Sequence, residues 1–505
     1  MFEGQPKGLF ALALSNTGER FGYYTMIAVF ALFLRANFGL SAGAAGLIYS
    51  LFLAFVYLSP IVGGILADKY GYGKMVTLGI VVMLFGYLLL SIPLGGNTFA
   101  LIFMLAALLL IGVGTGLYKG NVQVMAGNLY DDLKLAGKRD AGFSVFYMAV
   151  NIGALFAPTA AVRIKEWAEN SLGFSSNDAY HFAFAVACLS MVVSIIIYYT
   201  FRYTFRHVEG SVQSSAETAS HTAELSLKET KSRIFALCFV FAVVIFFWMS
   251  YNQNGLTLTY FADEFTQKTS YGLQSMWFDV VNLVMIIFIV YATFSLFQSK
   301  TKRARYIASD VIIFAMAVLI YKYTQANQVI DISAPIFQQF GAFFVVALTP
   351  VSLAIFGALA KKDKEPSAPR KIAYGMLVAS LAYVVMLIAS FGLNTPDQQK
   401  LAGDDGTFVS ANWLIVNYLI ITFAELLLSP MGISFVSKVS PPKYKGLMMG
   451  GWFVSTALGN ILVSVGGFLW GSYPLWFVWM VFIVFCVISA LFMFAMMKRL
   501  EKVAE

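Results

Sequence analysis

The segment Ser15-Asn16-Thr17-Gly18-Glu19-Arg20-Phe21-Gly22-Tyr23-Tyr24 carries a glutamate and an arginine side by side inside the first long apolar run of the chain. A charged side chain at the centre of a membrane helix costs about 2.5–3.5 kcal/mol on insertion scales, so function is the default explanation for such residues. Four residues at i, i+3, i+4 and i+7 share one helix face: Asn16, Glu19, Arg20 and Tyr23. We expect this polar stripe to face a water-filled cavity.

Apolar residues dominate the rest of the chain. Its 505 residues are 59% hydrophobic and only 12% charged. Because a helix needs about 20 apolar residues to cross a bilayer, the recurring apolar runs predict about fourteen spans and an all-α integral membrane protein. The net charge of +8 comes from basic residues in short loops between the runs. We therefore expect a lipid bilayer, and no nucleic acid, as partner.

A polar stretch divides the apolar runs into two groups. Residues 204–232 are rich in Ser, Thr and charge, which is typical of a linker. We expect an N-terminal six-helix bundle at 1–203 and a C-terminal six-helix bundle at 233–505, the latter with an extra hairpin at 276–323. Two halves of this kind predict a rocking transporter whose substrate site lies at mid-membrane. The fifth span is expected near 142–163 and the seventh near 234–262.

The distribution of Lys and Arg over the short loops predicts the orientation. Most of these residues lie in the loops on the same side as the N-terminus, and an even number of spans returns the C-terminus to that side. Cytoplasmic loops carry the excess of basic residues. We therefore expect a multi-pass protein with both termini in the cytoplasm.

Two further charges lie deep in predicted spans, Lys119 in the fourth and Glu425 in the twelfth. Together with Glu19 and Arg20 they sum to zero charge, an arrangement suited to a zwitterion. Glu425 would meet an amine, and Arg20 or Lys119 would meet a carboxylate, for which a planar guanidinium is the better match. The alternative is that these charges are structural ion pairs between helices. Aromatic residues suited to a pocket for variable side chains are Tyr23, Tyr24, Tyr57, Tyr147 and Trp248.

Other motifs do not indicate an enzyme. The run Gly112-Val113-Gly114-Thr115-Gly116 has the spacing of a phosphate loop but lies in mid-span with no preceding strand, so it predicts close helix packing. The three histidines have no ligand spacing, and nothing resembles a catalytic dyad. We expect neither a metal site nor a catalytic activity.

Several separate blocks resemble the proton-dependent oligopeptide transporter family of the major facilitator superfamily. One block, Gly64 to Gly71, is a general signal of the superfamily. The more specific blocks are Glu19 to Tyr24, Gly116 to Asn121, Asp140 to Ser144, Phe146 to Gly153 and Glu425 to Pro430. Phe247-Trp248 and Gly446 to Gly450 also match. The resemblance covers nearly the whole chain apart from the linker and the hairpin.

The resemblance implies a major facilitator fold in a bacterial inner membrane and import of di- and tripeptides with protons. No cofactor is implied beyond the proton as coupling ion, and facilitators commonly work as monomers. Glu425 would take the peptide amine, Asn151 the backbone, and Arg20 with Lys119 the carboxylate. The residues that would line the peptide site are Arg20, Tyr23, Tyr24, Tyr57, Lys119, Asn151, Trp248 and Glu425.

This chain departs from the family pattern at several positions. Asn16 stands where the family has the first glutamate of helix 1, and Asn252 stands where it usually has an acidic residue. Gly341-Ala342 replaces an Asn-Pro pair, and the hairpin follows the seventh span and not the sixth. An amide does not exchange a proton at working pH. Coupling is therefore expected to run through Glu19, Lys119 and Glu425, with Glu19 neutralised by the inward proton.

These departures leave two alternatives to peptide import. The first is a transporter of the same fold for a modified peptide, an amino-acid-like zwitterion or an organic anion, with altered proton coupling. The second is a sensor that binds peptide without net transport. Exchange of labelled for unlabelled substrate across the bilayer distinguishes a transporter from a pure sensor.

Overall fold

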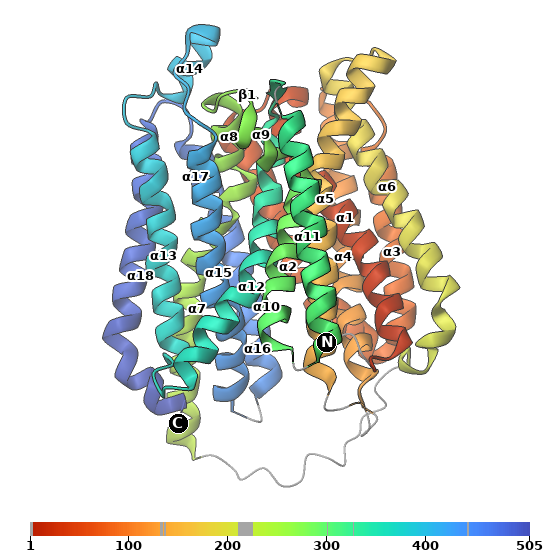
Figure 1. Cartoon of the computed structure of the whole chain (residues 1–505), viewed down its shortest axis with the longest axis vertical. Coiled ribbons are helices and arrows are strands. Elements are labelled where there is room, and N and C mark those ends of the chain that lie inside the picture. The colour runs from red at the N-terminus through yellow and green to blue at the C-terminus, as the bar shows by residue number, and fades with distance from the viewer. Residues whose placement is uncertain are drawn as a thin grey trace. The chain divides into compact units, whose positions relative to one another are not determined.

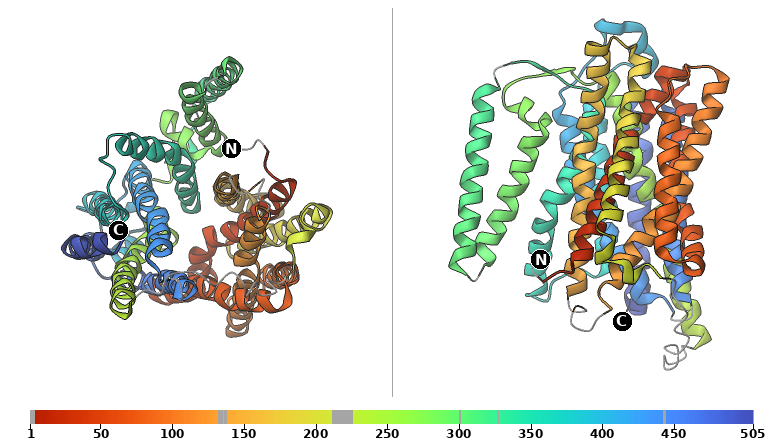
Figure 2. Two further views of the ribbon diagram at one scale, coloured as in Figure 1. Left: turned by 90° about the horizontal axis from the view of Figure 1, so that it is seen from below. Right: turned by 90° about the vertical axis from the view of Figure 1, so that its right-hand side faces the viewer.

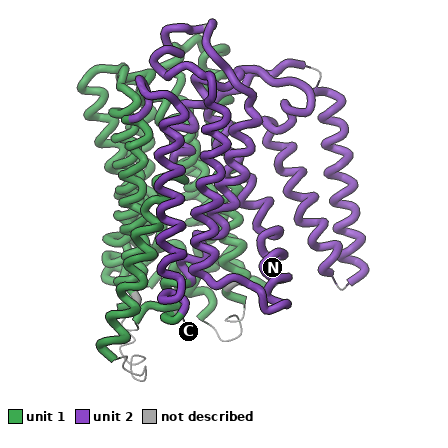
Figure 3. Tube along the Cα trace, turned by 90° about the vertical axis from the view of Figure 1, so that its left-hand side faces the viewer, with its two compact units in different colours: residues 1–252, 435–468, 502–505 green, residues 253–434, 469–501 purple. Residues whose placement is uncertain are grey.

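The computed structural model describes residues 4–131, 135, 138–210, 226–299, 301–326, 328–441 and 444–504. Within these residues, 14 helices are long and apolar enough to cross a membrane (Figure 1). The predicted all-α membrane architecture with about fourteen spans is therefore confirmed. The chain divides into two compact units (Figure 3), unit 1 with residues 1–252, 435–468 and 502–505, and unit 2 with residues 253–434 and 469–501. The predicted halves at 1–203 and 233–505 stay a prediction.

Unit 1 contains the first seven long helices and one from late in the chain. Their ends follow local sequence signals: the side chains of Ser41 and Asn97 cap α2 and α4, and Gly39 ends α1 with a φ of 62°. The helices are α1 (Lys7–Phe38), α2 (Ala42–Tyr70), α3 (Tyr72–Leu90), α4 (Thr98–Asn128), α5 (Arg139–Leu172), α6 (Ser176–Thr200), α7 (Leu227–Tyr251), α16 (Lys445–Leu462) and α17 (Ser464–Leu469), with short 3-10 turns η2 (Arg202–Thr204) and η3 (Arg206–Val208).

Unit 2 contains the remaining helices and the two short strands. Its helices are α8 (Thr257–Glu264), α9 (Gly272–Ser275), α10 (Val280–Gln298), α11 (Lys302–Gln325), α12 (Gln339–Ala360), α13 (Ala368–Ala389), α14 (Pro396–Ala402), α15 (Asn412–Val439) and α18 (Leu475–Ala504). The strands are β1 (Thr269–Ser270) and β2 (Ile330–Asp331), and 3-10 turns occur at η5 (Met276–Phe278), η6 (Ala334–Gln338) and η7 (Gly403–Asp405). The last residues of α15 and α18, and Leu469 at the end of α17, fall across the unit boundary.

The seventh predicted span is not one continuous helix. It is interrupted at Asn252–Gly255 by a 3-10 turn, η4, which separates α7 from α8. Asn and Gly favour turns over helix interiors, because Asn bonds its own backbone and Gly has high backbone entropy. The break places Asn252 at a helix end.

The predicted hairpin is present as α10 and α11, which lie side by side in Figure 2. Its base is closed by the antiparallel pairs Thr269–Asp331 and Ser270–Ile330. An ion pair of 2.7 Å joins Lys322, near the end of α11, to Asp279, which caps α10. Of the two helices, α10 packs on α12 and α11 packs on α10. The hairpin is thus a braced insertion at the side of unit 2's helices.

Glycines bring α4 close to both α2 and α3. A Cβ placed at Gly63 of α2 would collide with the carbonyl oxygen of Gly116, and one at Gly114 would lie 2.6 Å from the carbonyl oxygen of Gly79 on α3. Glycine permits such backbone approach because it has no side chain. The glycine run in α4 therefore packs helices together, as predicted.

Replacing Gly63 by alanine is expected to destabilise the protein by about 1–3 kcal/mol, because the new methyl group has to push α4 away. The matched control is Gly64→Ala, since a Cβ at Gly64 meets nothing within 4 Å. Thermal unfolding of the two purified variants measures the difference. Equal unfolding temperatures would contradict close packing at Gly63.

Candidate functional site

The charged pair on α1 is buried within unit 1. Glu19 is 0% exposed and Arg20 is 4% exposed. Two hydrogen bonds join them, from Arg20 Nε to Glu19 Oε2 and from Nη2 to Oε1, each 2.5 Å long. Adjacent residues on a helix do not normally face each other, so the arginine folds back onto its neighbour. This two-pronged geometry is the strongest form of a carboxylate–guanidinium contact and offsets part of the cost of burial.

An aromatic cluster centred on Tyr23 lies against the guanidinium. The Arg20 guanidinium carbon lies 4.8 Å from the centre of the Tyr23 ring, a distance typical of cation–π contact. Tyr24 meets Tyr23 edge to face at 5.3 Å, and Phe52 of α2 stacks on Tyr23 at 6.4 Å. Asn16, one turn earlier on α1, is also buried. The predicted polar stripe of α1 is therefore enclosed by protein.

Lys119 of α4 lies against an aromatic ring and not against a carboxylate. Its ammonium nitrogen lies 4.3 Å from the centre of the Tyr57 ring on α2. It interacts electrostatically with both Glu19 and Arg20, but no described carboxylate lies within ion-pair distance of it. Of the four charges within the spans, Glu19 and Arg20 form an ion pair with each other. Lys119 keeps its capacity to bind an added anion.

Two predicted residues lie on α5, which packs along α1. These residues are Tyr147 and Asn151. The Thr17 hydroxyl on α1 donates over 3.1 Å to the carbonyl of Ala149, which lies between them on α5. Asn151 is buried, and its amide donates to the Tyr147 carbonyl at 3.0 Å. Tyr147 is 51% exposed. The tyrosine ring is therefore accessible, whereas the asparagine donor is already bound within its own helix.

The end of α7 carries an aromatic cluster and an amide pair. Trp248 packs edge to face against Tyr251 at 5.5 Å and is buried. Asn252 donates from Nδ2 to Oδ1 of Asn460 on α16 at 2.5 Å. The Asn460 amide in turn donates to the Leu53 carbonyl of α2 at 3.5 Å. Asn252 is thus part of an amide network that joins α7, α16 and α2.

Asn460 is not among the site residues predicted from the sequence. Its signal was present, because an amide inside a membrane span is costly and is retained for a contact or a function. Asn460 is 208 residues from its hydrogen-bond partner Asn252, so no local pattern in the sequence indicates that the two side chains meet.

Glu425 and the Gly341-Ala342 pair belong to unit 2. Glu425 lies near the middle of α15, is partly buried, and has an interaction partner within the described part of the chain. Ala342 is buried on α12. The expectation that Glu425 and Arg20 hold opposite ends of one substrate stays a prediction.

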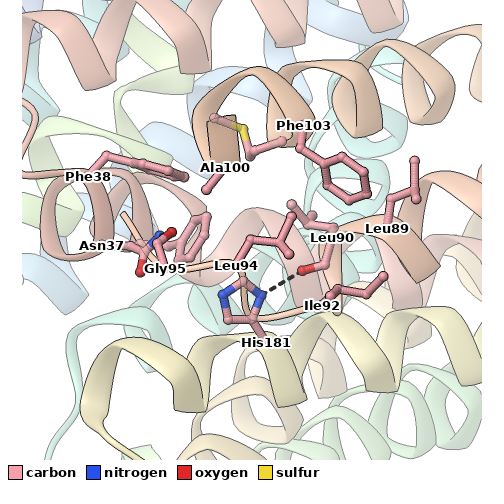
Figure 4. A pocket seen from close by; sticks show the side chains of 12 residues that line it. Asn37, Phe38, Leu89, Leu90, Ile92, Leu94, Gly95, Ala100, Phe103 and His181 are labelled. Atoms are coloured by element: carbon pink, nitrogen blue, oxygen red, sulfur yellow. Dashed lines mark hydrogen bonds between the residues drawn. The ribbon is translucent and has the colours of Figure 1, made fainter. Parts of the chain in front are cut away.

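One cavity is unsuited to a substrate (Figure 4). It lies in unit 1 near the α3–α4 connection, has a volume of about 10 Å³, and is lined mainly by apolar side chains. His181 lines it and donates from Nδ1 to the Leu90 carbonyl at 2.7 Å. A space of roughly 10–15 Å³ holds one water molecule at most. Across the described residues, no group of three or more His, Cys, Asp or Glu side chains could hold a metal ion.

Curated proteins similar to this chain are transporters. A peptide transporter of Yersinia enterocolitica, YePEPT, is 26% identical over 497 residues, covering 92% of this chain and 88% of the relative. A di-/tripeptide transporter of Lactococcus lactis is 26% identical over 490 residues, covering 91% and 89%. An uncharacterized transporter of Bacillus subtilis, YclF, is 29% identical over 483 residues, covering 91% and 87%.

Solved structures share the fold over the whole chain. A crystal structure of a peptide transporter, POT, in complex with sulfate has a TM-score of 0.74 and 24% identity, covering 100% of this chain and 96% of that one. A POT family transporter in complex with 5-aminolevulinic acid also has a TM-score of 0.74, at 21% identity, covering 100% and 98%. These likenesses confirm the predicted major facilitator fold with an extra hairpin. The POT family model matches residues 73–223, 210–304 and 313–467, more than half of the chain, and the chain therefore belongs to the POT family.

Proposed function

We propose that this protein imports di- and tripeptides by proton symport through alternating access. The single observation that supports this most is the buried Glu19–Arg20 pair together with Lys119, whose ammonium lies 4.3 Å from the centre of the Tyr57 ring. Two relatives that cover about nine tenths of the chain are named as peptide transporters. A site with a protonatable acid next to two cations suits a substrate that has a carboxylate.

The proposed cycle exchanges one partner of Arg20 for another. A proton from outside adds to the Glu19 carboxylate, which breaks its ionic hold on the guanidinium. The peptide carboxylate then accepts hydrogen bonds from Arg20, with Lys119 as a second cation, and Glu425 takes the peptide amine. Loss of the proton on the inside lets Glu19 bind Arg20 again and displaces the peptide.

The remaining properties are proposed from the sequence. The protein would be a monomer in the inner membrane of a bacterium, with both termini in the cytoplasm, and the proton would be its only coupling ion. The excess of basic residues in the loops on the N-terminal side supports this orientation.

Uptake of labelled dialanine into proteoliposomes, with and without an inward proton gradient, tests the proposal. Stimulation by the gradient is the expected result. Uptake at the same rate with and without the gradient would contradict symport. Binding of dialanine without counterflow would indicate a sensor. A panel of unlabelled competitors identifies the substrate class.

A second candidate substrate is an amino-acid-like zwitterion. It is favoured by the amides at positions 16 and 252 and by Gly341-Ala342, which remove polar groups expected for a peptide backbone. 5-Aminolevulinic acid, the ligand of one solved structure with this fold, is the competitor to include. Competition by it and not by dialanine would favour this candidate.

Replacing Asn252 by aspartate adds a titratable group at the position where the family resemblance leads us to expect an acid. We expect a steeper dependence of uptake on the inward proton gradient, because the carboxylate exchanges a proton and the amide does not. Asn252→Ala is the control, since it also breaks the hydrogen bond to Asn460 but adds no acid. The same gradient dependence in both variants would show that position 252 plays no part in coupling.

A further inference from the structure

An apolar groove lies where α2, α3 and α4 meet in unit 1. Its volume is about 370 Å³, within the range of small-molecule sites. The side chains that shape it are Phe55, Val62 and Leu66 of α2, Leu78 of α3, and Val113 and Leu117 of α4. Almost all of the lining is apolar, so its natural occupant is a hydrocarbon.

The groove opens on a surface that other apolar side chains continue. Val62 is 59% exposed and Leu78 is 46% exposed. Along α4 the exposed apolar positions Ile102, Leu105 and Leu109 lead at helical spacing to Val113 in the groove. Because α2, α3 and α4 are membrane spans, such a surface faces lipid chains and not water.

One end of the groove reaches the turn between α2 and α3, where basic residues gather. Tyr70, the last residue of α2, lines the groove, and the Lys69 ammonium lies 5.3 Å from its ring centre. Lys74, in the first turn of α3, is exposed. The acid in this turn, Asp68, already accepts a hydrogen bond of 2.5 Å from the Tyr72 hydroxyl. Lysines at a membrane interface attract anionic lipid head groups.

The helices that form the groove also hold the candidate site. Tyr57 of α2 and Lys119 of α4 contact each other across the same helix pair. That pair is held by a hydrogen bond of 2.9 Å from the Ser59 hydroxyl to the Gly112 carbonyl and one of 3.1 Å from the Asn121 amide to the Gly63 carbonyl. An occupant of the groove would therefore brace the two helices that place Lys119 on Tyr57.

We propose that this groove binds one anionic phospholipid of the surrounding bilayer, with an acyl chain between α2, α3 and α4 and the phosphate at Lys69 and Lys74. The apolar lining accounts for the binding of the acyl chain, and the two lysines account for the preference for an anionic head group. The site is separate from the candidate substrate site and does not depend on what the protein transports.

Native mass spectrometry of the purified protein tests the proposal, with phosphatidylglycerol and phosphatidylcholine of identical chains titrated into detergent. We expect one phosphatidylglycerol molecule to bind about 30-fold more tightly than phosphatidylcholine. This factor corresponds to a binding free energy of roughly 1 kcal/mol from the attraction of each of the two lysines to the anionic head group. The double variant Lys69→Gln/Lys74→Gln should remove this preference. The matched control is Lys361→Gln/Lys362→Gln, since these two exposed lysines follow α12 and do not line the groove, and it should keep the preference.

Filling the groove tests the acyl-chain contact. Val62→Trp should abolish tight binding of both lipids, whereas Ile65→Trp should not, because Ile65 is exposed on α2 but does not line the groove. If Val62→Trp does not fold, Leu78→Trp is the variant to test, because it fills the groove from α3. Equal retention of the two lipids by the unmodified protein would overturn the proposal. So would a dimer that Val62→Trp dissociates, since a second copy would then fill the groove.

Discussion

Arg20→Met is expected to lower the free energy of unfolding by about 3–5 kcal/mol and to abolish transport. The substitution leaves the carboxylate of Glu19 buried without its partner, and an unpaired buried charge costs this much. Both hydrogen bonds between the two side chains are lost with the guanidinium. Thermal unfolding in detergent measures the stability, and dialanine uptake into proteoliposomes measures the activity.

Two further variants separate stability from function. Glu19→Gln combined with Arg20→Met removes both charges, so it should recover most of the stability but none of the transport. Arg20→Lys keeps the charge but loses the planar fork, so it should recover stability in part. If Arg20→Met alone unfolds at the temperature of the unmodified protein, the pair is not the buried contact described here.

Glu19→Gln is expected to eliminate the accumulation of substrate that a proton gradient drives, so that the inside and outside concentrations become equal. The amide still accepts a hydrogen bond from Arg20 but does not exchange a proton. Counterflow of labelled for unlabelled dialanine should persist, because the cations that would hold the carboxylate remain. The measurement is uptake with and without the gradient, alongside counterflow.

The matched control for Glu19→Gln is Glu166→Gln. Glu166 also forms an ion pair with an arginine nearby in sequence, Arg163, over 3.2 Å, but on α5 Arg163 is 75% exposed and Glu166 34%. Exposed pairs of this kind contribute about 0–1 kcal/mol, so this variant should transport normally. Gradient-driven accumulation that survives in Glu19→Gln would exclude Glu19 as the proton carrier.

The ends of two helices show where prediction from apolar runs stops. The fifth span was expected near 142–163, but α5 extends to Leu172. The extension is held by ion pairs at helical spacing, among them Lys165 to Glu169 at 2.5 Å. A count of apolar residues detects the part of a helix that lies in the bilayer and not its polar continuation. The interruption of the seventh span at Asn252–Gly255 has a signal in the sequence, because Asn and Gly favour turns, but hydropathy alone does not detect it.

The positions of the charges within α1 and α4 could be predicted from the sequence, but the contacts of their side chains could not. Spacing along α1 placed Glu19 and Arg20 on one face, yet it gave no reason to expect that neighbours in sequence bind each other. The Lys119 ammonium lies on the Tyr57 ring of another helix, a contact that no spacing along the chain indicates. Asn460 was not identified as the partner of Asn252.

The membrane class, the number of spans, the hairpin and the family follow from the order of amino acids alone, because hydropathy and helical periodicity are properties of consecutive residues. The partner of each buried polar group depends instead on how the helices pack. Tyr57 and Lys119 lie on different helices, and the close approach of α2 to α4 at Gly63 and Gly116 sets their distance. Helix packing, and not spacing along the chain, therefore determines the electrostatics of the site.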